Sequence, residues 1–518
     1  MSKTTISSSP LRASPLRGIL LTATAAALLA GCPEPSDTSS TIQAAAPAAA
    51  DHEVWVIDQS DSPGRSLGGT LYIYAGDALG LDGSASTEPS ASTEPSATVE
   101  PSAIVDLGGA TTTMCRQNTG ANPVRPHMVL FNEEQTHALV AFVASGHVAV
   151  LDTTSREPVA CLRMSQSATG QQAHAAFPSP DGSYVIVANQ NGKRLERIDT
   201  DYSANSFVHN EAATLDLASC ETPSGLPCEA EGIRPDNAPI CPITDSSGDL
   251  VFVTLRGGGL LVVDPRPTPM EIVAEYDMQT VKGNGCGGIQ VADQMYINSG
   301  GRPGHMEHLA PYAFEVYRFP LADFAGSNDV AGEMIADDSL PEELAAEISP
   351  DEPSPDELLA AEEASHDTRP ANSPAPVVVY SAQGEHDSHG MAAVGDNSHL
   401  WVMDRHADVV EVFSVADDSH VATLDLNGEF TDNAAPDLAD ISPDGSRVYV
   451  AFRGPTPLSG DPHSATGSTP GLAVLAVHEG GISGRLVNLV PLSNVGEDGV
   501  ERADPHGLRV RRLISNQP

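Results

Sequence analysis

The chain has 518 residues, of which 70 are acidic and 26 are Lys or Arg, so its formal net charge at pH 7 is −44. A chain of this length has room for several domains or for one large repeat architecture. Because so strong a negative charge repels a phosphate backbone, it excludes a nucleic-acid-binding protein.

The N-terminus has the pattern of a bacterial export signal. Basic residues precede the apolar stretch 18–30, which is too short to span a bilayer comfortably. This stretch runs into Leu-Ala-Gly-Cys at 29–32, which resembles the bacterial lipobox. The resemblance implies that 1–31 is a lipoprotein signal peptide, removed before acylation of Cys32. Because residue 33 is Pro rather than Asp, the resemblance also implies that the lipoprotein is sent to the outer membrane. We therefore expect a cell-envelope protein anchored to the membrane by its lipid, facing the periplasm or the cell surface.

Beyond a polar, Pro- and Ala-rich tether at 32–51, β-rich runs recur at regular spacing. Each complete unit has about four short runs, as in the blade of a propeller, and the units span 127–164, 174–217, 240–278, 284–321, 389–427 and 437–492. The segment 52–79 supplies middle strands without an inner strand, and 504–513 supplies an inner strand alone. Joined, they make a seventh blade. The sequence therefore predicts an all-β, seven-bladed β-propeller, closed by pairing of the C-terminal strand with the N-terminal strands, which leaves no exposed edge.

Three segments, SPDGSYVIVAN, SPDGSRVYVAF and DPHGLRV, resemble the repeats of the YVTN (YncE-like) seven-bladed β-propellers of the quinoprotein amine dehydrogenase-like group. The resemblance covers roughly 50–515 and implies the fold rather than an activity, because such propellers host many functions. We assign 52–515 to the propeller. It carries two insertions: residues 86–103 repeat Glu-Pro-Ser and are predicted to be disordered, and residues 329–376 are acidic and predicted to be solvated, with short amphipathic helices.

The seven cysteines leave six once Cys32 is lipidated. An even number in an exported protein indicates disulfides. Cys220 and Cys228 bracket a short loop and are the pair we expect to bond. The pairing of the other four stays open.

A His or Asp recurs at one position of the repeat. Counting back eleven residues from the second strand, and adding the DPHG segment, gives His127, His174, His389, Asp437 and His506. Cys241 and Cys286 lie close to the same position in two other units. Inner strands line the central channel of a propeller, so we expect these side chains to form a ring near one mouth.

Imidazole, carboxylate and thiolate groups are ligands of Zn and Cu, so this ring is a candidate metal site, and the sequence indicates no other cofactor. Copper-bearing nitrous oxide reductase and some zinc-chaperone propellers are similar in using inner-strand His residues. The neighbours His127, His174 and His506 are the subset we expect to bind. Two alternatives stay open: the histidines belong to the repeat and bond backbone groups between blades, or an organic ligand occupies the channel mouth. His305 and His308, and His386 beside His389, are weaker candidates.

The function expected from the sequence is therefore that of a monomeric envelope lipoprotein that binds a small ligand, a protein or a metal ion at the mouth of its channel. We find no nucleophile elbow and no catalytic triad in the spacing, so we expect a binding protein more than an enzyme. A propeller enzyme, either a lactonase-like hydrolase or a quinoprotein-type oxidoreductase, is the alternative, and a purely structural surface lipoprotein is a third.

Overall fold

The structure is a computed structural model that describes residues 51–80, 99–283, 285–300, 313–324, 373–384, 386–456 and 466–513. These residues belong to the compact unit Ala50–Pro518. The predicted signal peptide, nearly all of the tether, and most of both predicted insertions lie outside them, as do His305 and His308. Within the part described, no helix has the length and apolar character needed to cross a membrane.

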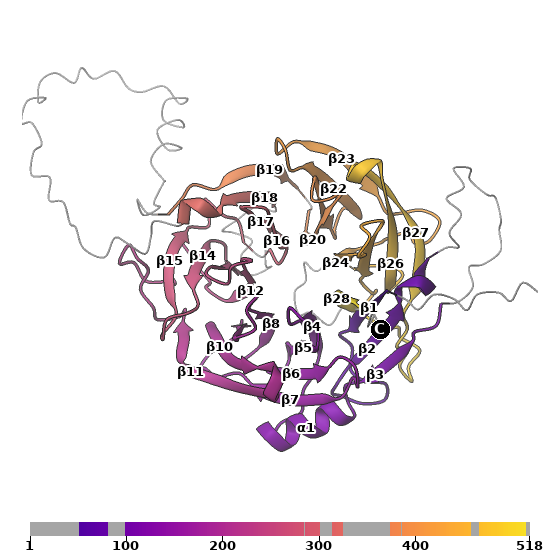
Figure 1. Cartoon of the computed structure of the whole chain (residues 1–518), viewed down its shortest axis with the longest axis horizontal. Helices are drawn as coiled ribbons and strands as arrows, with labels where there is room; N and C mark the ends of the chain where they lie inside the picture. Colours follow the sequence, from indigo (N-terminus) through magenta and orange to yellow (C-terminus); the bar gives the residue numbers. More distant parts are fainter. Residues whose placement is uncertain are drawn as a thin grey trace, which may run out of the picture. The chain divides into compact units, whose positions relative to one another are not determined.

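Seven four-stranded antiparallel sheets are arranged in a ring, each with one strand near the centre (Figure 1). This confirms the predicted seven-bladed β-propeller. From the inner strand outward, blades 1 to 3 are β28 (Pro505–Arg512), β1 (His52–Asp58), β2 (Thr70–Ala75), β3 (Ala103–Asp106); β4 (Pro126–Phe131), β5 (His137–Phe142), β6 (His147–Asp152), β7 (Pro158–Arg163); and β8 (Ala173–Pro178), β9 (Tyr184–Asn189), β10 (Arg194–Asp201), β11 (Ser206–Asp216).

The remaining four blades have the same order of strands. They are β12 (Pro239–Thr244), β13 (Val251–Leu255), β14 (Leu260–Asp264), β15 (Glu271–Tyr276); β16 (Gly288–Val291), β17 (Gln294–Ser299), β18 (Ala313–Pro320), β19 (Val377–Gln383); β20 (Ser388–Val394), β21 (His399–Asp404), β22 (Val409–Ser414), β23 (His420–Asp425); and β24 (Pro436–Ile441), β25 (Arg447–Phe452), β26 (Gly471–His478), β27 (Ser483–Pro491). The helical elements are α1 (Ala110–Thr119) and the short 3-10 turns Gly76–Leu79, Tyr202–Ala204, Leu321–Phe324 and Glu479–Gly481.

The amino-acid pattern of each strand follows its place in the blade. Middle strands are sandwiched between neighbouring blades, so β5, with the sequence HALVAF, is buried at every position. Outer strands meet solvent on one face, so β23, with the sequence HVATLD, has only exposed and partly buried residues, which alternate from its second residue on. The hydrophobic side chains that face one another between blades make up the core.

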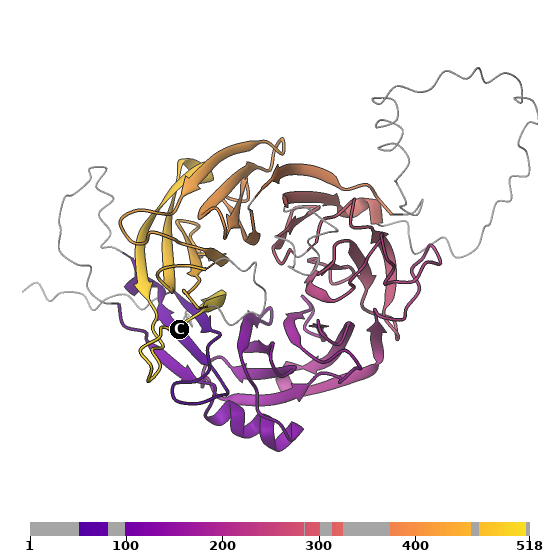
Figure 2. The same cartoon turned by 180° about the vertical axis from the view of Figure 1, so that it is seen from behind.

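Blade 1 joins the two ends of the propeller, as predicted. The inner strand β28 pairs antiparallel with β1, and β1 pairs antiparallel with β2. Figure 2 shows, from behind, yellow C-terminal strands beside indigo N-terminal strands in this part of the ring. Leu508 and Val510 of β28 pack in one cluster with Val54 and Val56 of β1. Because this pairing covers the edge of β1 with the C-terminal strand, the ring closes without a free inner edge.

Three details of the strand assignment differ from the sequence prediction. Blade 5 does not end at residue 321, because its outer strand β19 begins at Val377, so the acidic insertion lies between β18 and β19. The strand β3 begins at Ala103, so the prediction of disorder is wrong for that residue. The helix α1 was not predicted, because three successive threonines have low helix propensity. A disulfide between Cys115 of α1 and Cys161 of β7 fastens this helix to blade 2.

Candidate functional site

The inner strands bring the predicted ring residues together at the centre of the propeller. Each occupies the second position of its strand and is at most 9% exposed: His127 in β4, His174 in β8, His389 in β20, Asp437 in β24 and His506 in β28. Cys241 is the third residue of β12, and Cys286 precedes β16 by two residues. The equivalence that the repeat count predicted is therefore present in three dimensions.

A β-bulge accompanies these positions. The register between the inner strand and its partner shifts between Pro126 and Met128 in blade 2, and between Pro436 and Ala439 in blade 7. A bulge locally bends the strand and redirects a side chain. The glycines that follow two of the ring histidines have a related role: a Cβ at Gly507 would lie 2.6 Å from the carbonyl oxygen of His127. The bulges and the close approach of neighbouring inner strands thus bring the ring side chains within contact of one another.

Asp437 is the centre of one half of the ring. Its Oδ2 accepts hydrogen bonds from Nδ1 of His506 at 2.7 Å and from Nη1 of Arg453 at 3.0 Å. Its Oδ1 lies 3.2 Å from Nε2 of His389 and 3.6 Å from Nη1 of Arg405. Burial by itself would raise the pKa of Asp437, but the neighbouring imidazoles and guanidinium groups hold it well below its usual range. Asp437 is therefore an ionised carboxylate at neutral pH.

Arg405 and Arg453 were not predicted as part of the site. Each is the residue directly after the second strand of its blade, β21 and β25, a repeat position that would have revealed them. Arg453 binds Asp504 through Nε at 2.6 Å and Nη2 at 2.9 Å, and Arg405 binds Asp387 through Nη2 at 2.7 Å. The carboxylates of Asp387, Asp437 and Asp504 therefore meet the guanidinium groups of Arg405 and Arg453 beside the imidazoles, and Arg125 interacts with Asp504 as well.

The ring histidines are neutral at physiological pH. Burial lowers the pKa of His174 to about 3, and it holds the pKa values of His127 and His389 well below the usual value. The pKa of His506 is also lowered, because burial outweighs the opposing effect of Asp437. A neutral imidazole keeps a lone pair on one nitrogen, which is the form that binds metal ions.

Several buried atoms of the ring make no hydrogen bond. They are Nδ1 of His174, both ring nitrogens of His389, Oδ1 of Asp437 and Nε2 of His506. Buried polar atoms without partners are rare and costly in folded proteins, so each of them calls for an explanation.

The ligand atoms gather in two groups rather than in the trio expected from the sequence. The atoms of His389, Asp437 and His506 lie within 4.8 Å of one another, and so do those of His174, Cys241 and Cys286. His127 belongs to neither group. Its Nδ1 bonds Oε1 of Gln59 at 2.6 Å, its Nε2 lies 3.3 Å from Nε2 of His174, and its ring stacks on that of His506 with centroids 3.8 Å apart.

The remaining candidates lie apart from the ring groups. His386 bonds Asp404 through Nδ1 at 2.6 Å, which raises the pKa of this half-buried imidazole. The predicted pair Cys220–Cys228 is confirmed as a disulfide, and Cys241 is bonded to Cys286. A cavity of about 510 Å³ lies beside α1, where Arg65 and Arg116 are among its lining residues, away from the ring.

No protein-family model matches this sequence, and no curated protein matches it. Solved structures with which it shares similarity include a periplasmic gluconolactonase of Pseudomonas aeruginosa, at 13% identity over 89% of this chain and 99% of that chain, with a TM-score of 0.48. A protein from Lactobacillus plantarum is 9% identical over 89% and 99%, with a TM-score of 0.49. A putative 6-phosphogluconolactonase of Bacteroides fragilis is 11% identical over 92% and 99%, with a TM-score of 0.38. Likeness at this level carries no conclusion about activity. The assignment of a seven-bladed propeller rests on the strand pairing.

Proposed function

We propose that this protein is a lipid-anchored propeller of the cell envelope that binds a transition metal ion through His389, Asp437 and His506. The observation that carries the proposal is the convergence of these three side chains. Their ligand atoms lie within 4.8 Å of one another, and each residue has a buried atom without a hydrogen bond. One ion bound to all three residues would give a partner to one such atom of each, which lowers the cost of leaving buried polar atoms unpaired.

Local charge supports a cation at this point. Asp437 is ionised, and its Oδ1 makes no hydrogen bond. Arg405 and Arg453 also bind Asp387 and Asp504 at hydrogen-bonding distance, so part of their positive charge is already compensated. A divalent ion bound to the Asp437 carboxylate would therefore meet one negative charge and two neutral imidazoles.

The chemistry of the ligands favours Zn²⁺ or Cu²⁺. Imidazole suits both ions, and a carboxylate oxygen completes a common zinc donor set. Because three protein ligands leave a fourth position of a tetrahedral ion open, water or a small anionic ligand could occupy it. This arrangement fits a binding protein whose buried metal ion keeps one coordination position for a water molecule or a small anion.

The test is a metal titration of the purified protein. Wild type should bind one Zn²⁺ or Cu²⁺ per chain, and the double variant His389→Ala/His506→Ala should bind it at least 100-fold more weakly, which is about 2.7 kcal/mol. The control is His478→Ala, because His478 is exposed at the end of β26. A wild type that binds no metal, or a double variant that binds as tightly as the control, would show that these histidines serve the repeat alone.

One observation favours a second function, that of a hydrolase. His506 donates through Nδ1 to Asp437 and has a free Nε2, which is the arrangement of a general base held by a carboxylate. In this alternative His506 is the base rather than a metal ligand, and it would activate a water molecule for attack on a lactone. Lactone hydrolysis by the metal-free protein that is lost in His506→Ala would favour the enzyme. Metal binding without hydrolysis of a panel of lactones would favour the binding protein.

A further inference from the structure

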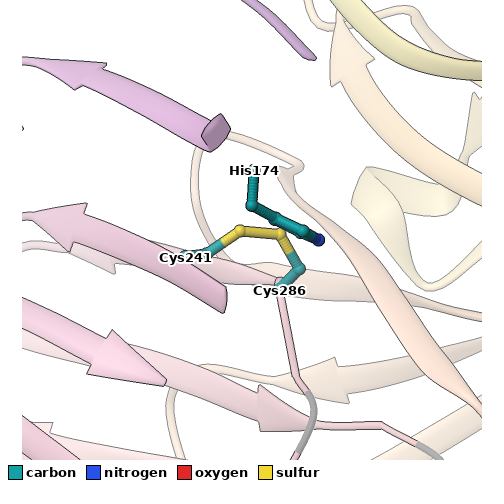
Figure 3. A group of neighbouring side chains, drawn as sticks. All are labelled: His174, Cys241 and Cys286. Carbon is teal, nitrogen blue, oxygen red and sulfur yellow. A yellow bond between two sulfur atoms is a disulfide. The ribbon is translucent and has the colours of Figure 1, made fainter. Parts of the chain in front are cut away.

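A second cluster lies on the arc of the ring away from Asp437. Figure 3 shows the imidazole of His174, from β8, next to the disulfide that joins Cys241 of β12 to Cys286. Cys241 is fully buried and Cys286 is 4% exposed. The disulfide therefore links blade 4 to blade 5 at the inner strands, in the region where the histidine ring is built.

Hydrogen bonds define which nitrogen of His174 is free. Gln59 donates through Nε2 to the Asp504 carboxylate at 3.2 Å, so its Oε1 must accept from Nδ1 of His127 at 2.6 Å. The Nε2 of His127 then carries a lone pair and accepts from Nε2 of His174 at 3.3 Å. This leaves Nδ1 of His174 unprotonated. The carbonyl of Ile240 approaches the ring closely enough to favour its protonated form, but Nδ1 makes no hydrogen bond of regular geometry.

The backbone around Cys286 is held in place by glycines. A Cβ at Gly285 would lie 1.8 Å from the carbonyl oxygen of Asn298, and one at Gly287 would lie 2.2 Å from that of His389. Only glycine permits such close packing against β17 and β20. The segment is thereby fixed with Cys286 facing Cys241, and a change at the sulfur atoms must be taken up by the side chains.

We propose that His174, Cys241 and Cys286 form a redox-gated metal site, separate from the site at Asp437. A dithiol reductant transfers two electrons and two protons to the Cys241–Cys286 disulfide, which breaks the S–S bond, and the reductant becomes a disulfide. A zinc ion then displaces the two thiol protons and is bound by two thiolates and one imidazole nitrogen. In the reverse direction, a disulfide oxidant accepts two electrons from the two thiolates and takes up two protons to become a dithiol. The Cys241–Cys286 disulfide reforms and the ion is released.

The geometry allows this exchange. Ligand atoms of the three residues already lie within 4.8 Å of one another, and the two Cα atoms are 5.2 Å apart. Two sulfurs on a tetrahedral zinc ion are roughly 3.8 Å apart when each Zn–S bond is about 2.3 Å. Rotation of the two cysteine side chains can supply that separation without a shift of the backbone. Thiolate and imidazole ligands suit Zn²⁺, and Co²⁺ can replace it as a spectroscopic probe.

The other two disulfides supply the comparison. Cys115–Cys161 fastens α1 to β7 at the outside of blade 2, and Cys220–Cys228 closes a short loop after β11. Among the residues that the structure describes, neither pair belongs to a group of three candidate ligands. Thiols released from these pairs should therefore bind metal weakly.

The experiment is a Co²⁺ titration of the purified full chain without oxygen, before and after reduction with a phosphine. Only the reduced protein should bind an additional Co²⁺ with a strong thiolate-to-cobalt charge-transfer band in the near ultraviolet. His174→Ala should weaken that binding at least tenfold, and Cys220→Ser/Cys228→Ser should leave it unchanged. His174→Ala retains the disulfide, so the test does not depend on whether Cys241→Ser/Cys286→Ser folds. Reoxidation should remove the band.

The proposal is overturned if reduced wild type shows no charge-transfer band, or if His174→Ala binds as tightly as the Cys220→Ser/Cys228→Ser control. The proposed function is tested separately by the same titration. Co²⁺ bound to His389, Asp437 and His506 involves no thiolate, so it should appear in the oxidised protein without the band. The variant His389→Ala/His506→Ala should lose that binding and retain the charge-transfer band on reduction.

Discussion

Replacing Arg453 by Met should destabilise the propeller by about 3–5 kcal/mol, the usual cost of breaking a buried ion pair by removing one partner. Arg453 is only 1% exposed and binds Asp504 through two nitrogens at 2.6 and 2.9 Å and Asp437 through a third at 3.0 Å. Met has a similar length and keeps the apolar packing. The variant therefore removes the guanidinium and leaves two buried carboxylates short of a partner.

Urea unfolding at pH 7 measures this loss. Trp55 lies in β1, at the closure of the ring, and Trp401 lies in β21, so tryptophan fluorescence reports on two parts of the propeller. Near-ultraviolet circular dichroism should give the same midpoint if unfolding is cooperative. The control is Arg502→Met, because Arg502 and its partner Asp498 are 38% and 55% exposed and such a pair contributes about 0–1 kcal/mol.

At acid pH, the difference in unfolding free energy between Arg453→Met and wild type should become smaller. The pKa of Asp437 is depressed in the folded wild-type protein. Its contribution to stability is therefore present above the unfolded pKa of about 4 and lost as the pH falls below it.

The reasoning would be refuted if Arg453→Met lost less than about 1 kcal/mol of unfolding free energy at pH 7, as little as Arg502→Met. Such a result would mean that the two carboxylates need no buried cation.

Three further predictions concern the ring, the anchor and the closure. Burial lowers the pKa of His174 to about 3, so between pH 6.5 and 3 the unfolded chain binds a proton that the folded chain does not. The free energy of unfolding should therefore decrease by about 1.4 kcal/mol for each unit by which the pH is lowered in this range. His174→Gln should reduce the slope of unfolding free energy against pH by that amount, and an unchanged slope would contradict a buried neutral imidazole. Cys32→Ser should move the protein from membranes to the soluble exported fraction, and continued membrane association would count against a lipid on Cys32. Deleting 503–518 removes β28 and exposes the edge of β1, so this variant should aggregate or unfold without cooperativity. The control, deletion of 86–98, should leave the unfolding midpoint unchanged. Equal behaviour of the two variants would disprove closure of the ring by β28.

The fold could be predicted because its signals are local. Each blade is a run of short β segments separated by turn residues, as in Ser179–Gly182, where the glycine has a φ of +70° that favours Gly. In the sequence, the C-terminal inner strand has no further strands after it, and the segment 52–79 has middle strands but no inner strand. Together they make up one blade, so the sequence predicted that the C-terminal strand closes the ring. The placement of the ring residues on the inner strands followed in the same way, because equivalent positions of a repeat occupy equivalent places in a propeller.

Only the tertiary structure decided how the ring is divided. The sequence placed His127 with His174 and His506, but the hydrogen bonds of His127 to Gln59 and His174 engage both of its nitrogens, and the ligand atoms of His506 converge with those of His389 and Asp437 instead. Contacts of this kind join residues of different blades, which lie up to several hundred positions apart in the chain. They also depend on β-bulges that no local sequence pattern predicts.

The same reason applies to the parts of the site that the sequence did not reveal. Arg453 meets Asp504 across the junction of blades 7 and 1, and Cys241 meets Cys286 across the junction of blades 4 and 5. Residue types and spacing determined which side chains reach the centre of the propeller. The packing of one blade against the next determined which of them are charged, which are bonded, and which retain a free lone pair for a metal ion.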